Sequence, residues 1–524
     1  MNDATSRRAH GLRGLVTSVV DGVPMSGGHT LPSTNPARLD EVVGEVSFGD
    51  AATVVRAAES AKKAQEDWAA IPAPIRGRAI AHIGRLIEDN AEALAKLVTA
   101  EIGKPYAEAL GEVREIIDTC DFFLGEGRRL YGQTVPSEMP DKQLFTFRRP
   151  VGTVAVITAG NFPVAVPAWY IVPALLAGNT IVWKPAEYSA VSSAAFHELF
   201  VRGGGLPDGV FNVVHADGAA TFAGLQQSLE AGLLDKVGFT GSSAVGREIG
   251  ALTGRYLQTA CLELGGKNPL LVTPSADLDL AVEGALFSGF GTAGQRCTSL
   301  GTVIVHESVH DQFLARFNAA VADAKVGDPT RDVLMGPMMD AKFAERFEDF
   351  LGWVQPHQAV QAAYGKITKD NPRDGFVGDP STGLYYHPVV IDGVRPGDRI
   401  FMEETFGPIV GVASYQSLNE AIEMANAPGY GLSSSIYTTD PKDAFTFRDK
   451  ISAGMVSINN STSGAEAHLP FGGNGKSGNG SRQSGVWVLD QFTRWQAMNW
   501  DYSGRLQKAQ MDVVELTPDT TFRL

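Results

Sequence analysis

The spacing of hydrophobic positions divides the chain into regions with different expected structure. Residues 1–45 alternate over short stretches between turns, which predicts short strands. Further along, apolar residues recur at helical spacing, which predicts helices over 50–70, 75–102 and 105–124. Asp50 can cap the first helix, Gly103 can end the second, and Pro105 suits the first turn of the third.

Beyond residue 150, short apolar strands alternate with helical segments. The expected strands are 154–157, 180–183, 211–214, 236–239, 269–272, 302–305 and 409–412. The expected helices are 166–177, 277–290 and one that begins near residue 309. This alternation predicts parallel sheets with helices on both faces, so the expected fold class is α/β. Two such domains are expected to join near 263–268.

Two regions leave alternatives open. Residues 131–149 and the tail after Arg482 suit neither domain core, and they form either an exposed strand arm or poorly ordered loops. Residues 151–183 contain no charged residue, and that length could cross a bilayer. Prolines interrupt the run, so a buried strand, a loop and a core helix are the preferred interpretation.

Composition narrows the functional classes. The 524 residues include 44 Lys and Arg and 59 Asp and Glu, which gives a net charge of −15 and disfavours nucleic acid or an anionic membrane as main partner. Three cysteines without a CxxC pair indicate neither a disulfide framework nor a metal site, and a reducing cytoplasm is the simplest compartment. The first ten residues lack an apolar run, so no secretion signal is expected.

Cys297 is the first candidate for chemistry. It ends the sequence Gly291-Thr-Ala-Gly-Gln-Arg-Cys, in which glycines permit close approach of a ligand and Arg296 could favour the thiolate. A free cysteine is more often a small buried core residue, and this is our interpretation of Cys120 and Cys261.

Glu263 is the second candidate. It stands between Leu262 and Leu264, and a carboxylate in apolar surroundings has a raised pKa that suits proton abstraction from water. The alternative is a surface glutamate at a strand end. A thiol and such a base can together form a covalent adduct and then hydrolyse it.

Polar residues follow several expected strands. Asn161 can donate to a developing oxyanion, or it is a turn asparagine. Lys184 and Glu187 could bind ribose hydroxyls, and the segment Gly241–Gly246 opens a helix whose first amides suit a phosphate. Each of these segments can also be a solvated turn. Two further loops, which are structural turns or pocket walls, cover 403–408 and 469–473.

Taken in order, these segments form a series of motifs. They are Asn161-Phe-Pro, Lys184-Pro-Ala-Glu, Phe239-Thr-Gly-Ser, Glu263-Leu-Gly-Gly-Lys, Gly294-Gln-Arg-Cys, Glu404-Thr-Phe-Gly-Pro and Pro470-Phe-Gly-Gly. The series resembles that of the NAD(P)-dependent aldehyde dehydrogenase superfamily over about residues 15–505. The resemblance implies a Rossmann-like cofactor domain, an α/β catalytic domain and a small β bridging arm through which the family forms dimers or tetramers. The implied bounds are 1–130 and 151–262 for the cofactor domain, 263–470 for the catalytic domain, and 131–150 with 483–510 for the arm.

The resemblance also implies a reaction. The Cys297 thiolate attacks an aldehyde, while the Asn161 amide and the Cys297 N–H hold the oxyanion. Hydride passes to NAD(P)+, a thioester forms on Cys297, and Glu263 activates the water that releases a carboxylic acid. Members that transfer the acyl group to CoA resemble this chain but lack the carboxylate at Glu263, so hydrolysis is expected.

The implied cofactor is NAD, with NADP possible. Glu187 could accept bonds from both hydroxyls of the adenosine ribose but would repel a 2′-phosphate, which favours NAD. Glu404 is implied to hold the nicotinamide ribose, and Phe406 to lie near the nicotinamide ring. The remaining residues implied to bind the cofactor are Thr158, Lys184, Gly241, Ser242 and Gly246.

Departures from the family pattern bear on the substrate, a small aldehyde. Gly160 and Gly291 stand where many members carry aromatic residues, and the loop 459–468 is polar. A wide tunnel with a polar mouth predicts a semialdehyde with a carboxylate or hydroxyl, and the chain resembles the α-aminoadipic semialdehyde dehydrogenase branch and its bacterial relatives. Alternatives are broad oxidation of aromatic or hydroxylated aldehydes, and a non-catalytic protein of this fold. Candidate pocket residues are Phe162, Trp169, Arg296, Thr298, Ser463 and Phe471.

Overall fold

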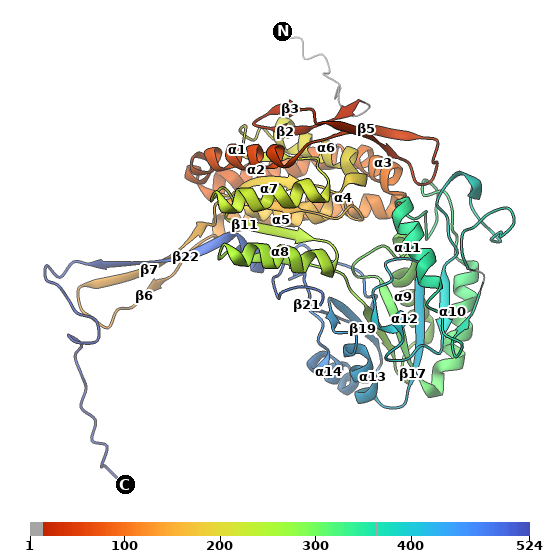
Figure 1. Cartoon of the computed structure of the whole chain (residues 1–524). Helices are drawn as coiled ribbons and strands as arrows, with labels where there is room; N and C mark the ends of the chain where they lie inside the picture. The colour runs from red at the N-terminus through yellow and green to blue at the C-terminus, as the bar shows by residue number, and fades with distance from the viewer. Residues whose placement is uncertain (1–13, 363) are drawn as a thin grey trace.

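The computed structural model describes residues 14–362 and 364–524 (Figure 1). The expectation of no secretion signal concerns residues 1–10, which lie outside the described residues. The predicted short strands before residue 50 are present from Leu15 onward. They are β1 (Leu15–Val16), β2 (Ser18–Val20), β3 (Val23–Met25), β4 (His29–Thr34) and β5 (Val42–Phe48).

The first large sheet has seven strands in the order β12-β11-β8-β9-β10-β2-β3. Its parallel strands are β8 (Thr153–Ile157), β9 (Thr180–Lys184), β10 (Phe211–Val213), β11 (Lys236–Thr240) and β12 (Ala260–Glu263). One face packs on α1 (Ala51–Ala70), α7 (Gly218–Glu230) and α8 (Ser243–Arg255). The other face packs on α2 (Ala73–Asp89), α4 (Tyr106–Arg129), α5 (Ala165–Ala177) and α6 (Ala190–Glu198). The two-sided α/β arrangement predicted from the alternation is therefore confirmed.

The helix expected over 75–102 is wrong in one respect, because it is two helices. The chain breaks at Asn90 between α2 and α3 (Ala91–Ile102), where the Asn90 side chain donates to the Leu86 carbonyl at 2.7 Å. Asparagine competes with helical hydrogen bonds in this way. Asp50 caps α1 and Gly103 ends α3 in a left-handed conformation, as predicted.

The second large sheet follows in sequence and is parallel except at its edge strand β15 (Ala359–Val360). The remaining strands, in order, are β16 (Val389–Asp392), β17 (Ile409–Tyr415), β14 (Leu300–His306), β13 (Asn268–Val272), β19 (Ser433–Tyr437) and β20 (Met455–Ile458). Its covering helices include α9 (Leu278–Phe290), α10 (His310–Asp323), α11 (Ala341–Leu351), α13 (Leu418–Asn426) and α14 (Pro441–Lys450). The chain changes sheet between β12 and β13, where the join was predicted.

Residues 151–183 supply β8, α5 and β9, and every residue of α5 is buried. The buried strand and helix predicted for this uncharged run are confirmed. Among the residues that the structure describes, no helix is both long and apolar enough to cross a membrane.

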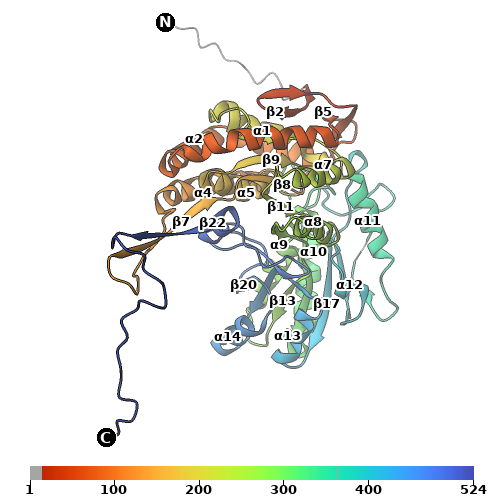
Figure 2. The same ribbon diagram turned by 60° about the vertical axis from the view of Figure 1, so that its left-hand side comes forward.

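A three-stranded sheet projects from the body (Figures 1 and 2). It consists of β6 (Thr134–Val135), β7 (Lys142–Pro150) and β22 (Thr493–Asp501), and β22 pairs with β7 along its whole length. Residues 131–149 and part of the tail after Arg482 are thus a strand arm rather than loops. The chain end continues beyond this arm, away from both large sheets.

Candidate active site

Cys297 follows a tight turn over Gly291–Gly294 at the end of α9. Thr292, Ala293 and Gly294 all have positive φ, at 51°, 54° and 67°. A Cβ at Gly294 would collide with the Gly407 carbonyl, so this glycine is required by both conformation and space. Gly291 has negative φ, and its missing side chain leaves room for the Arg296 guanidinium.

The cysteine loop is held by residues from both large sheets. The Asn161 side-chain amide donates to the Gln295 carbonyl at 2.8 Å, and the Asn268 amide donates to the Cys297 carbonyl at 2.8 Å. Asn161 lies in the turn between β8 and α5 and is buried. An amide NH2 carries two hydrogens, so one remains for a developing oxyanion beside Cys297.

Glu263 is the last residue of β12 and is 2% exposed. Within the described part of the chain, neither of its carboxylate oxygens has a hydrogen-bond partner. Burial raises the pKa of Glu263 well above its usual value, in the predicted direction, while the Arg482 charge acts against this. The interpretation as a surface glutamate is therefore wrong.

The Cys297 thiol is not activated by Arg296, and that prediction is wrong. Burial raises the pKa of Cys297 to about 12, and the charges of Glu404 and Glu263 act in the same direction. The Arg296 guanidinium instead pairs with Glu108 and stands 4.5 Å from the Phe287 ring centroid. Its charge is neutralised by a carboxylate that sequence reasoning did not associate with it.

A cavity of about 400 Å³ opens onto Cys297. All six candidate pocket residues line it, namely Phe162, Trp169, Arg296, Thr298, Ser463 and Phe471. Trp169 and Phe471 form one wall, with ring centroids 4.8 Å apart. The structure thus brings together residues from α5, the cysteine loop and the 459–473 region, as the substrate prediction requires.

Three carboxylates of α4, which were not predicted as site residues, also belong to this cavity. Glu108, Glu112 and Glu115 line the same cavity. Their spacing along a predicted helix is the signal that could have revealed them, because residues three and four apart share a helix face. Glu112 pairs with the buried Lys104 and accepts the first amides of α5, which fixes the turn that carries Asn161.

Glu115 connects this cavity to a second one at the surface. The outer cavity is lined by Glu115 together with Asp118, Asp121, Glu466 and His468. Burial, and then the neighbouring Glu112, raise the pKa of Glu115 to about 8. The second cavity is therefore lined mainly by acidic and polar side chains, some of them from the loop 459–468.

Six of the candidate cofactor residues, Thr158, Lys184, Glu187, Gly241, Ser242 and Gly246, lie at or after the carboxyl ends of β8, β9 and β11, where α/β sheets bind nucleotides. The other two, Glu404 and Phe406, lie in the segment before β17. Lys184 contacts Glu187 at 3.0 Å. Burial acts to raise the pKa of Glu187, but the Lys184 ammonium outweighs it and the pKa lies below its usual value. The Glu187 carboxylate is therefore ionised at neutral pH.

The remaining residues of this group have structural partners as well. The Thr158 hydroxyl accepts from the Trp183 indole at 3.0 Å, and Ser242 caps α8 by accepting from Val245 at 3.3 Å. The Gly241 amide donates to the Glu263 carbonyl, and Gly246 permits α8 to pack on Leu264. The start of α8 nevertheless presents a helix N-terminus that suits a diphosphate.

The Glu404 side chain lies against Gly265 and Gly266, in the segment that links β12 to β13. The Gly266 amide donates to it at 3.1 Å, and a Cβ at Gly265 would occupy the place of its carboxylate. Burial raises the pKa of Glu404 to about 7. Phe406 has a φ of 34° and packs 5.7 Å from the Phe343 ring. Two carboxylates, Glu187 and Glu404, and the N-terminus of α8 are the kinds of group that bind ribose hydroxyls and a diphosphate.

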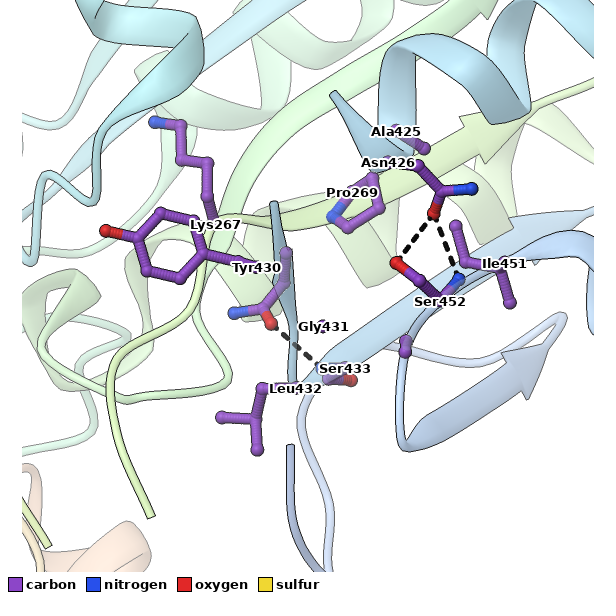
Figure 3. A pocket seen from close by; sticks show the side chains of 12 residues that line it. Lys267, Pro269, Ala425, Asn426, Tyr430, Gly431, Leu432, Ser433, Ile451 and Ser452 are labelled. Carbon is purple, nitrogen blue, oxygen red and sulfur yellow. Dashed lines mark hydrogen bonds between the residues drawn. The ribbon is translucent and has the colours of Figure 1, made fainter. Parts of the chain in front are cut away.

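Lys267 lies at the same link and lines a small pocket beside β13 (Figure 3). Its amine is buried without a hydrogen-bond partner among the described residues, and burial lowers its pKa to about 7. In Figure 3 its side chain extends away from the hydrogen-bonded pair Asn426 and Ser452. Its alkyl chain fills the space above Gly301, where a Cβ would collide with it.

Residues 23–498 match the sequence pattern of the Aldehyde dehydrogenase family. The chain belongs to the aldehyde dehydrogenase family. It is 36% identical to an alpha-ketoglutarate semialdehyde dehydrogenase of Haloferax volcanii, over 89% of this chain and 94% of the relative. It is 35% identical to the alpha-aminoadipic semialdehyde dehydrogenase of Mus musculus, over 86% and 82% respectively. The resemblance inferred from the motifs is confirmed, and the protein is an NAD(P)-dependent aldehyde dehydrogenase.

The fold agrees with solved structures of the family. The betaine aldehyde dehydrogenase of Staphylococcus aureus, solved in complex with NAD+, matches with a TM-score of 0.87 and 29% identity, over 94% of this chain and 95% of that chain. A putative aldehyde dehydrogenase from Burkholderia cenocepacia matches with a TM-score of 0.88 and 31% identity, over 94% and 99% respectively. The predicted aldehyde dehydrogenase fold is confirmed.

Proposed function

We propose that the protein oxidises a polar or carboxylated semialdehyde to a carboxylic acid with NAD+ and without CoA. The observation that carries the proposal is a cavity that opens onto Cys297 and whose walls combine aromatic rings with the Arg296–Glu108 ion pair. Asn161 donates to the loop that carries Cys297, and the charge of the buried Glu263 acts on the Cys297 thiol. Relatives named for semialdehydes, including a glutarate-semialdehyde dehydrogenase of Pseudomonas aeruginosa at 35% identity, support the substrate class.

The residues divide the reaction between them. The Cys297 sulfur bonds to the aldehyde carbon, and Asn161 donates to the oxygen that becomes negative. Because burial raises the pKa of the thiol, its proton has to leave to solvent before the sulfur bonds to the aldehyde carbon. NAD+, when bound, would supply the acceptor for the hydride that leaves the former aldehyde carbon. Glu263 then takes a proton from water, the water oxygen bonds to the thioester carbon, and the carbon–sulfur bond breaks.

Two features of the cavity separate the candidate substrates. A carboxylate that approaches Arg296 has to share the guanidinium with Glu108, so a flexible chain with a dipolar or hydrogen-bonding end fits better than a bare carboxylate. Phe162, Trp169 and Phe471 line the same cavity, and they favour the second candidate, an aromatic or hydroxylated aldehyde.

A substrate panel tests the proposed function. NADH formation is followed without CoA for acetaldehyde, benzaldehyde, and succinic, α-ketoglutaric and α-aminoadipic semialdehydes. We expect the highest kcat/KM among the carboxylated semialdehydes with NAD+. A preference for benzaldehyde would instead establish the second candidate, and it would leave the chemistry of Cys297 unaffected.

Removal of the Glu108 charge that pairs with Arg296 is expected to increase the preference for carboxylated over aromatic aldehydes. Glu108→Gln leaves the guanidinium without a counter-charge, so kcat/KM for succinic semialdehyde should rise about tenfold relative to benzaldehyde. Glu198→Gln, which removes a carboxylate on the surface of α6, is the matched control. An equal change for both aldehydes would show that Arg296 does not meet the substrate carboxylate.

Glu187 is proposed to select NAD+ over NADP+. Glu187→Gln removes the carboxylate that repels a 2′-phosphate and keeps Lys184 as a cation, so the ratio of kcat/KM for NAD+ to that for NADP+ should fall about tenfold or more. The ratio is measured with one saturating aldehyde. An unchanged ratio would show that Glu187 does not select the cofactor and that other residues of the β9–α6 turn do.

The arm is proposed to join subunits into a homodimer or homotetramer. Trp495, Met498 and Trp500 are exposed along β22, which is an uncovered edge of the arm.

The two large sheets support the division into a cofactor domain of 1–130 and 151–262 and a catalytic domain of 263–470. The three unpaired cysteines suit a reducing cytoplasm.

A further inference from the structure

Arg482 lies in the loop between β21 (Asn474–Gly475) and α15 (Leu489–Phe492), and neither the motifs nor the cavity assign it a function. Its guanidinium donates to the Gly473 carbonyl at 3.3 Å, the Ser481 carbonyl at 2.9 Å and the Asn474 side chain at 2.9 Å. Within the described residues it forms no ion pair with a carboxylate at contact distance. The loop thus holds a cation whose charge is not neutralised locally.

Gly472 lies next to both Arg482 and Glu263. A Cβ built at Gly472 would lie 2.7 Å from Glu263 Oε1 and 3.1 Å from Arg482 Cδ, so the two side chains meet over this glycine. Gly472 also has a φ of 152°, which other residues rarely adopt. Any side chain at position 472 of the Pro470-Phe-Gly-Gly motif would therefore displace the Glu263 carboxylate or the Arg482 side chain.

The other groups around Glu263 do not provide a positive charge. Cys261 is on the same strand, Cys297 is on the cysteine loop, and Tyr170 is on α5; burial raises the pKa of each, so all three are neutral at neutral pH. The Gly473 amide and the Ser481 hydroxyl are neutral dipoles near the carboxylate that also favour its ionised form, although neither donates a hydrogen bond to it. Arg482 is the cation that opposes the effect of burial on Glu263.

We propose that Arg482 is a positioning residue for Glu263, which favours the ionised form of the buried carboxylate, the form that accepts a proton from the hydrolytic water. The proposal rests on the function proposed above for Glu263. In this hydrolysis step, one water proton moves to Glu263 and the water oxygen bonds to the thioester carbon. The carbon–sulfur bond then breaks, and its electron pair stays on the Cys297 sulfur. Arg482 touches none of these atoms and acts through charge and through its three anchors in the loop.

Arg482→Met separates this function from the oxidation step. In rapid-mixing experiments with NAD+ and a saturating aldehyde, the first turnover should keep its rate. Steady-state hydrolysis at pH 7 should fall about tenfold, which produces a burst of one NADH per active site. The pH at which hydrolysis is half-maximal should rise by about one unit, because loss of the nearby cation favours the protonated carboxyl.

Arg482→Lys and a surface control make the result specific. The lysine variant keeps the charge without the anchors, so it should return the pH midpoint most of the way to that of the wild type. Arg448→Met removes an exposed cation of α14 and should change neither the burst nor the midpoint. Equal slowing of the first turnover and of hydrolysis, with an unchanged midpoint in both Arg482 variants, would reduce Arg482 to a structural residue and overturn the proposal.

Glu263→Gln distinguishes failure of the proposal from failure of its premise. If that variant hydrolyses the thioester normally, the proposed function of Glu263 is wrong and Arg482 has no base to position. If Glu263→Gln shows a burst and Arg482→Met does not, Glu263 is the base and our inference about Arg482 is wrong.

Discussion

Cys297→Ala is expected to abolish aldehyde oxidation. The sulfur forms the bond that makes the aldehyde carbon a hydride donor, and the neighbouring Thr298 and Gln295 provide no replacement nucleophile of similar strength. NADH formation with the best aldehyde should fall by at least about 10⁴-fold. The cofactor residues lie on other elements, so NADH binding, followed by its fluorescence, should stay within about twofold of the wild type.

A second cysteine provides the matched control for that experiment. Cys120→Ala removes a buried thiol from the core between α2 and α4, where the sulfur lies against Gly84. It should cost about 1–2 kcal/mol of the free energy of unfolding and leave kcat unchanged. Full activity in Cys297→Ala, or loss of activity in both variants, would contradict the assignment of Cys297 as nucleophile.

Local patterns were sufficient to predict much of the fold. The strands β8, β9 and β11 are short apolar runs between turns, and the predicted ranges agree with the structure to within one residue at either end. Gly103 was predicted to end a helix because glycine adopts positive φ without strain, and it does so at 74°. Asn90 shows the limit of this approach, since one side chain divides a continuous apolar pattern into two helices.

The electrostatics of the site could not be predicted in the same way. Arg296 is adjacent to Cys297 in sequence, but its charge is satisfied by Glu108, which lies on a helix of the other sheet. Sequence proximity therefore suggested an activation that the folded chain does not provide. The flanking leucines made burial one of two open alternatives for Glu263, and the structure shows that the side chain is buried. The opposing cation, Arg482, comes from a loop far away in the chain and left no such local signal.

Glu263→Gln is expected to uncouple oxidation from hydrolysis. The amide cannot accept a proton from water, so the acyl group should remain on Cys297 after the first turnover, and steady-state turnover should fall about 10²- to 10³-fold. Since Gln occupies nearly the same volume as Glu, the buried site should keep its shape. The first NADH should still form, which gives a burst equal to the concentration of active sites.

The pH dependence provides the sharper test of that variant. In the wild type, burial raises the pKa of Glu263, so hydrolysis should be slow at low pH, increase as the carboxyl loses its proton, and reach a plateau above that pKa. The glutamine variant has no proton to lose, so this rising limb should be absent. Acid quenching and mass measurement should find the acyl group on Cys297. A variant that retains the limb and accumulates no thioester would show that another group is the base.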